Sequence, residues 1–300
     1  MPVDVNRPGP WNHRNLTARG TRFHVALAGP EAPSGSGVLT LLIHGFPECW
    51  WTWRHVIPAL AQAGHRVAAL DLRGFGGSDR PPSGYDLVTL AQDIAAVVRS
   101  LGHERAMVIG AGLGGQVAWA LPHVAPDLTR AIVPVGAPHP LALRSLRSRA
   151  LSGPALQYAS LQIPGLAERR LRSRSALEGL LRSWAGPHTR EAVAEEAPYY
   201  AELLSRPGAA RSALEPLRNL MLSRAETAAL ERPVTVPVLS VQGQLDPVQP
   251  AQAYARDTHH VTGNLHQATI RRSGHFPQEE APAELVRALI PFLADVAPAV

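Results

Sequence analysis

Four short segments combine glycine with residues that could do chemistry. Asp246 and His275 are the clearest candidates, because a carboxylate and an imidazole are common groups for moving protons in enzymes. Glycine at the same places allows tight turns that other residues resist. The segments are His44-Gly45-Phe46-Pro47, the glycine-spaced turn at 110–115, Gly243-Gln244-Leu245-Asp246-Pro247 and Gly274-His275-Phe276.

Each segment follows a short apolar run that predicts a buried strand. Amphipathic stretches between these runs predict helices, and strands that alternate with helices imply a parallel, doubly wound sheet of the α/β class. The four segments then lie at the carboxyl ends of strands, where open α/β sheets place their sites. The expected strands are 38–43, 66–70, 106–109, 130–135, 236–241 and 266–270, and the expected helices are 54–63, 87–101, 113–124, 250–257 and 281–294.

The alternation is interrupted between residues 141 and 232, where the pattern is helical and rich in arginine. We expect residues 1–140 and 233–300 to form one core, with 141–232 as an inserted helical lid over the sheet. All 29 basic residues of the chain are arginine, and 14 of them lie in the insertion beside nine acids. A solvated helical face is the favoured interpretation. Contact with an anionic substrate or a membrane surface is the less favoured alternative, and nucleic acid is not expected, because no recognition motif accompanies the arginines.

Composition excludes several classes of protein. At 300 residues, 45% hydrophobic and 18% charged, the chain is globular rather than disordered. No apolar run approaches the roughly 20 residues of a membrane span, and no apolar leader is evident at the start. The single cysteine, Cys49, excludes an internal disulfide framework. We therefore expect a cytoplasmic protein without metal or cofactor.

The glycine-spaced turn followed by the acid and then the histidine resembles the α/β-hydrolase fold. Three longer motifs narrow the resemblance to epoxide hydrolases of the actinobacterial type, over roughly residues 15–295. These are His44 to Glu48 with Trp50, Trp53 and Arg54, the loop Arg73 to Pro81, and Gly274 to Glu280.

The resemblance implies a role for each site residue. His275 corresponds to the base that activates water, and Asp246 to the acid that orients it. The backbone amides of Phe46 and Leu113 would form the oxyanion hole. In such enzymes an aspartate at the turn opens the epoxide and forms an ester, which the activated water cleaves.

The nucleophile is where the sequence departs from this pattern. Gly112 occupies the position of the aspartate, or of the serine of esterase relatives, and glycine has no group that can attack. Its neighbours Ala111 and Leu113 also differ from the usual His and Trp. Cys49 and Glu48 are weak substitutes, and Cys49 is expected to be buried filler.

The two lid tyrosines that polarise the epoxide oxygen in such enzymes also lack counterparts. Tyr158 stands out of register in the first segment, and the second, at 213–218, has no tyrosine. Tyr199 and Tyr200 lie between them and are interpreted as helix surface or lid contacts.

Three functions follow as hypotheses. We favour a pseudoenzyme that binds a small apolar organic ligand under the lid without covalent chemistry. The alternative is a hydrolase or lyase in which the His275–Asp246 dyad activates water or abstracts a proton. A protein that associates with surfaces through its basic lid is the third. The turn at 110–115 also fits a dinucleotide-binding spacing, but it comes late in the sheet and lacks the acid that should follow.

Overall fold

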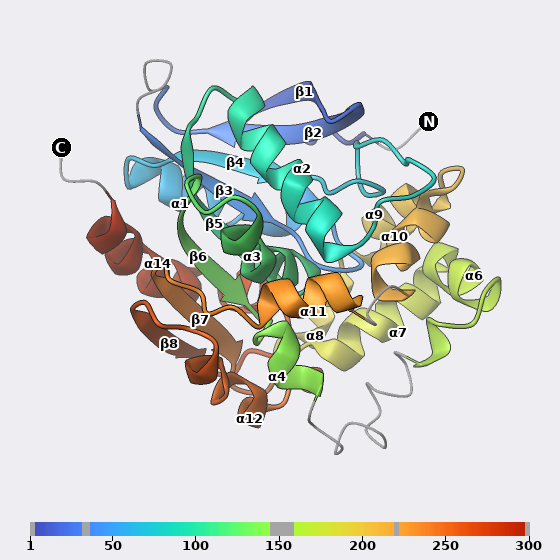
Figure 1. The fold of residues 1–300 in the computed structure, drawn as a ribbon. Coiled ribbons are helices and arrows are strands. Elements are labelled where there is room, and N and C mark those ends of the chain that lie inside the picture. The colour runs from blue at the N-terminus through green and yellow to red at the C-terminus, as the bar shows by residue number, and fades with distance from the viewer. Residues whose placement is uncertain (1–3, 32–36, 145–158, 219–221, 298–300) are drawn as a thin grey trace.

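An eight-stranded sheet runs through the centre of the molecule (Figure 1). The structure is a computed structural model that describes residues 4–31, 37–144, 159–218 and 222–297. The strand order is β1-β2-β4-β3-β5-β6-β7-β8, with β1 and β2 antiparallel to their neighbours and the other pairs parallel. The strands are β1 (Asn12–Ala18), β2 (Thr21–Ala28), β3 (Val38–Ile43), β4 (Arg66–Leu70), β5 (Arg105–Ala111), β6 (Thr129–Val135), β7 (Val238–Gly243) and β8 (Leu265–Ile270).

The α/β class and the mostly parallel sheet are confirmed, and the amino-terminal hairpin is an addition. The sequence pattern does not predict β1 and β2. β1 is a mostly exposed edge strand of polar residues, so its sequence carries little apolar signal. The hairpin turns at Arg19 and Gly20, whose φ angles are 50° and 71°.

Helices cover both faces of the sheet. Helix α2 (Leu87–Ser100) lies beside α3 (Leu113–Val124), and α1 (Ile57–Gln62) contacts α14 (Pro282–Val296). Helix α2 begins at Asp86, whose side chain accepts a hydrogen bond from the Thr89 amide at 2.8 Å. Its buried face includes Leu90, Ile94 and Val98, as its 3.6-residue spacing predicts. Shorter helices follow β7 and β8, namely α12 (Ala251–Tyr254), the 3-10 helix η3 (Asp257–His259) and α13 (Pro277–Glu280).

Only helices are found in the described residues between β6 and β7. They are α4 (Pro140–Arg144), α6 (Leu166–Arg172), α7 (Arg174–Trp184), α8 (Arg190–Ala194), α9 (Ala197–Ser205), α10 (Ala209–Arg218) and α11 (Arg224–Leu230). Helices α6, α7, α9 and α10 pack on one another, at the right of Figure 1. Helix α11 instead packs on α3, and Glu226 accepts a hydrogen bond from the Leu87 amide at 3.0 Å. The end of the insertion is thus fastened to the core.

The described helices include none with the length and apolar character that crossing a membrane requires. The longest, α14, has 15 residues. Large buried side chains, such as Trp53, Trp119 and Phe23, fill the core.

Candidate active site

The turn between β5 and α3 is built around Gly112. Its φ of 47° and ψ of −110° lie in a region that side chains with a Cβ resist. The Gly112 amide donates to the Val135 carbonyl at 2.9 Å, which ties the turn to β6. Its own carbonyl accepts from the Gln116 amide at 3.1 Å and so starts the helix. The backbone of a sharp strand-to-helix turn is therefore formed without a side chain at its tip.

The backbone around Gly112 leaves room for a Cβ. A Cβ built on Gly112 meets only His275 Nε2, at 3.5 Å, and the Gly45 Cα, at 3.6 Å, which are ordinary contact distances. Gly114 contrasts with it, because a Cβ there would lie 2.4 Å from the Ile43 carbonyl oxygen. A small side chain at position 112 would thus fit and point toward the imidazole.

His275 and Asp246 come together as the sequence predicts. Nδ1 of His275 lies 2.9 Å from Oδ2 of Asp246, and both side chains are almost fully buried. The other carboxylate oxygen of Asp246 accepts from the amides of Val248 and Gln249, at 2.7 and 3.1 Å. Because Nδ1 donates to the carboxylate, Nε2 carries the lone pair that faces position 112.

The environment of His275 favours its protonated form. Burial acts to lower its pKa, but the charge of Asp246 and the hydrogen bond to it outweigh burial and raise the pKa above 6.5. A base with a raised pKa is strong, but it is available in its neutral form only at higher pH. The dyad can therefore accept a proton from a water or substrate group held near Gly112.

The loop that carries His275 is clamped to the inserted helices by one carboxylate, Glu280. Its Oε2 accepts from the Gly186 amide, the Thr189 hydroxyl and the Gly274 amide at 2.6–2.8 Å. Its Oε1 accepts from the Phe276 amide at 2.9 Å. The position of the base thus depends on residues 186–189 of the insertion.

Trp184, at the end of α7, makes two further contacts with His275. Its carbonyl accepts from the His275 amide at 2.9 Å, and its ring meets the imidazole edge-on at a centroid distance of 5.5 Å. The rings of Phe46 and Phe276 lie near Trp184, so the surroundings of the dyad are largely apolar.

The residues predicted for the oxyanion hole lie around the same turn. Leu113 is the first residue of α3, where backbone amides have no partner within the helix. Phe46 follows Gly45, whose Cα would lie 3.6 Å from a Cβ built on Gly112. The structure brings the two loops together, and the role of the two amides stays a prediction.

Glu48 is a buried carboxyl close to this site. Its Oε1 accepts from the Thr52 hydroxyl at 2.6 Å, and the Gln278 amide group lies 3.3 Å from both of its oxygens. Burial, followed by the charge of Glu279, raises the pKa of Glu48 to about 8. Cys49 beside it is buried, as expected, and burial raises the pKa of its thiol.

Among the described residues, no hydrogen bond or ring contact joins a tyrosine between β6 and β7 to His275 or Asp246. Tyr158 lies outside those residues. Tyr199 and Tyr200 belong to α9, and the hydroxyl of Tyr200 lies 3.4 Å from Glu279, which pairs with Arg54. Tyr200 is buried, so it is a contact between α9 and the core rather than part of an exposed helix surface.

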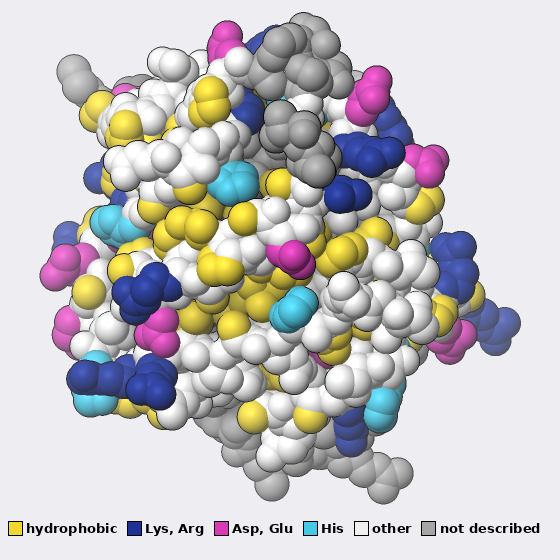
Figure 2. Space-filling view, turned by 90° about the vertical axis from the view of Figure 1, so that its left-hand side faces the viewer, with side chains coloured by type: hydrophobic (Ala, Val, Ile, Leu, Met, Phe, Trp, Pro, Cys, Tyr) yellow, Lys and Arg dark blue, Asp and Glu magenta, His cyan; other side chains and the backbone are white. Residues whose placement is uncertain are grey.

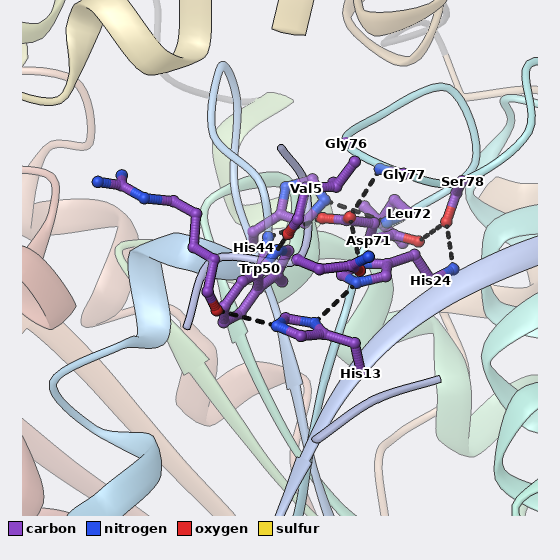
Figure 3. A network of polar contacts seen from close by, with 12 residues as sticks. Val5, His13, His24, His44, Trp50, Asp71, Leu72, Gly76, Gly77 and Ser78 are labelled. Atoms are coloured by element: carbon purple, nitrogen blue, oxygen red, sulfur yellow. Dashed lines mark hydrogen bonds and ion pairs between the residues drawn. The ribbon is translucent and has the colours of Figure 1, made fainter. Parts of the chain in front are cut away.

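A second polar network, which no sequence motif indicates, links two histidines to Asp71 (Figure 3). His13 lies 3.0 Å from His24, and His24 lies 2.8 Å from Asp71. His13 Nε2 faces the carbonyl of Arg7 at 2.9 Å and must donate to it. Burial lowers the pKa of His13 below its usual value, and each ring nitrogen of the two histidines faces a polar atom.

Asp71 also holds the loops around the site. It accepts from the amides of Trp50 at 2.8 Å and Gly77 at 2.9 Å. Burial alone would raise its pKa, but the hydrogen bond and charge of His24 lower the pKa overall. The network thus joins β2, the segment after Phe46 and the glycine-rich loop.

Most of the chain matches one known protein family. Residues 40–282 match the alpha/beta hydrolase fold family. Epoxide hydrolase A of Mycobacterium tuberculosis is 30% identical over an alignment 323 residues long, gaps included, which covers 95% of this chain and 98% of the relative. Epoxide hydrolase B of the same organism is 44% identical over 128 residues, but these span 42% of this chain and only 35% of that relative.

Solved structures agree with the sequence matches. An epoxide hydrolase from an endophytic Streptomyces superposes with a TM-score of 0.79 at 28% identity, covering 96% of this chain and 97% of the other. The Cfl2 protein of Burkholderia cenocepacia gives a TM-score of 0.81 at 29% identity, covering 94% and 96%.

Proposed function

We propose that this chain, which belongs to the α/β-hydrolase family and is epoxide hydrolase-like, binds a small apolar ligand without covalent catalysis. One observation carries the proposal. The residue at the strand-to-helix turn, where the resemblance places the nucleophile, is Gly112, which has no side chain, and a Cβ there would lie 3.5 Å from Nε2 of His275. Removing the nucleophile of a covalent hydrolase costs on the order of 10⁶-fold in turnover.

The apolar surroundings support an apolar ligand. Phe46, Trp184 and Phe276 lie around the dyad, and Gly112 itself is partly exposed between buried neighbours. We place this binding between the sheet and the inserted helices, which would then serve as a lid.

The cytoplasm is the compartment we propose, supported by the single, buried Cys49.

The test is to restore the missing group. In Gly112→Asp, a carboxylate would stand on a Cβ that faces Nε2 of His275, so we expect turnover of an aryl glycidyl ether where the wild type shows none. The carboxylate would attack an epoxide carbon, the carbon–oxygen bond would break, and the alkoxide would take its proton from water. In Gly112→Asp combined with His275→Ala, the ester would form but not hydrolyse. Intact-protein mass spectrometry should then detect an adduct of one substrate mass.

Gly112→Asn is the matched control. It imposes the same backbone strain and nearly the same volume as Gly112→Asp but supplies no carboxylate. Turnover in Gly112→Asn equal to that of Gly112→Asp would show that the position is not the nucleophile's. A covalent adduct on the wild-type protein would overturn the proposal, because another residue would then attack.

A second function is favoured by the intact dyad. With Asp246 in place and Nε2 facing Gly112, His275 would activate water directly and contribute about 10²–10⁴-fold of catalysis. Wild-type turnover that disappears in His275→Ala, with no adduct in either protein, would select this function. Ligand binding without turnover, seen as a rise in melting temperature, would select the first.

A further inference from the structure

The start of α6 exposes apolar side chains to solvent. Residues 162–166 are all exposed, and they include Ile163, at 50%, and Leu166, at 38%. Among the described residues only one other large hydrophobic side chain, Leu245, is exposed to this degree. The face on which α14 lies also shows apolar side chains near its centre (Figure 2). Ile163, Leu166 and Leu245 do not belong to α14. Helix α6 lies on the opposite side of the molecule (Figure 1).

Arginines follow these apolar residues directly. Arg169, Arg170 and Arg172 on α6 are exposed, and no acidic group among the described residues pairs with them. Arg211 on α10 is 77% exposed, with Glu215 at 3.8 Å. The nearest acid on α6, Glu168, is bound to Arg218 at 3.0 Å and so does not neutralise the others.

Three of these arginines border one hollow. It has a volume of about 470 Å³ and is lined by Gly165, Glu168, Arg169, Arg172, Gly208 and Arg211. Guanidinium groups from two helices that face a shared hollow suit a phosphate, because arginine binds phosphate oxygens through several N–H groups.

We propose that this end of the molecule docks on a membrane surface rich in anionic phospholipid. Ile163 and Leu166 would enter the boundary between headgroups and acyl chains, and Arg169, Arg172 and Arg211 would bind headgroup phosphates. Exposed apolar residues beside exposed cations are the combination that surface binding to anionic bilayers needs. A nucleic acid would use the cations but gain little from isoleucine and leucine, because it offers aromatic bases for stacking rather than acyl chains.

The test measures co-sedimentation of the full chain with phosphatidylcholine vesicles that contain 30% phosphatidylglycerol, or none. We expect binding only to the anionic vesicles, and weaker binding at higher salt. Replacing Arg169, Arg172 and Arg211 with glutamine should weaken it about 100-fold. Ile163→Ser with Leu166→Ser should weaken it at least about 10-fold, because the apolar contribution is lost.

Matched controls separate this surface from net charge. Glutamine at Arg99, Arg105 and Arg287 removes the same charge from other exposed positions, and Leu245→Ser removes another exposed leucine. Both controls should bind as the wild type does. Equal loss in the arginine control would overturn the proposal, because net charge would then explain the binding.

Two other results would also overturn it. Binding to RNA or heparin that needs the arginines but not Ile163 and Leu166 would identify a soluble polyanion as the partner. Self-association that Ile163→Ser with Leu166→Ser abolishes, without vesicle binding, would identify a second copy of the chain. Circular dichroism of each variant reports whether it folds.

Discussion

Glu48 is a carboxyl group that the fold keeps from water, and its titration should be visible in stability. Its pKa of about 8 exceeds the usual value, so the folded state retains the proton. Its contribution to stability is fully present below the unfolded pKa of about 4.3 and is lost as the pH rises through about 8. Glu48→Gln cannot ionise, so its melting temperature should fall less than that of the wild type between pH 6 and 9.

Glu202→Gln is the control for this experiment, because Glu202 is an exposed acid on α9. Its melting temperature should follow the wild-type pH curve. If Glu48→Gln follows the same curve, Glu48 ionises at ordinary pH and the buried carboxyl has no part in the pH dependence.

Among the elements, the loop of His275 and the turn after α7 are joined by Glu280. Glu280→Ala removes the acceptor for three backbone amides and one hydroxyl, so buried donors lose their partner. We expect the free energy of unfolding to fall by about 3 kcal/mol or more, since each lost partner costs about 1–3 kcal/mol. Urea unfolding measures this.

Hydrogen exchange locates the effect. The amides of Gly186, Gly274 and Phe276 should exchange faster in Glu280→Ala, whereas those of β5 should change only with global stability. Glu195→Gln, an exposed acid on the same insertion, should alter stability by no more than about 0.5 kcal/mol. Unchanged exchange at the three amides would contradict the clamp.

For the whole molecule, Asp71 is the point where distant parts of the chain meet. Asp71→Asn removes a buried carboxylate that lies 2.8 Å from His24 and accepts from the amides of Trp50 and Gly77. We expect the free energy of unfolding to fall by about 3–5 kcal/mol. The pKa of Asp71 is lowered in the folded state, so its contribution is present above about pH 4 and lost as the pH falls through the folded value.

The melting curve from pH 3 to 7 measures the effect, and it should be flatter in Asp71→Asn than in the wild type. Asp79→Asn is the comparison, because Asp79 pairs with Arg22 at 3.1 Å at the surface, with both side chains about half exposed. That pair should contribute about 1 kcal/mol or less. Equal losses in the two variants would show that the network stabilises no more than a surface pair.

The sequence predicts the parts of the fold that repeat a pattern. Strand 38–43 and helix 113–124 have the bounds that their apolar spacing predicts. The proximity of His275 and Asp246 follows from the parallel sheet, because both residues come after neighbouring strands, β8 and β7.

The sequence does not predict features that depend on three-dimensional contacts. The edge strand β1 is too polar to give an apolar signal, and its position is set by pairing with β2. Glu280 acts on Gly186 and Thr189, about 90 residues away, and no local pattern links them. The same holds for His13, His24 and Asp71, which lie apart in the sequence and come together only in the fold.

The clamp at Glu280 has a consequence for exchanging parts between relatives. A graft that replaced the insertion alone would separate Gly186 and Thr189 from the carboxylate that binds them, and the imported turn would meet Gly274 at a backbone contact too tight to adjust freely. Residues 184–189 and 272–280 therefore have to be transferred together, because each segment supplies contacts that the other needs. A chimera designed to change ligand preference while keeping His275 in place has to take both segments from the same relative.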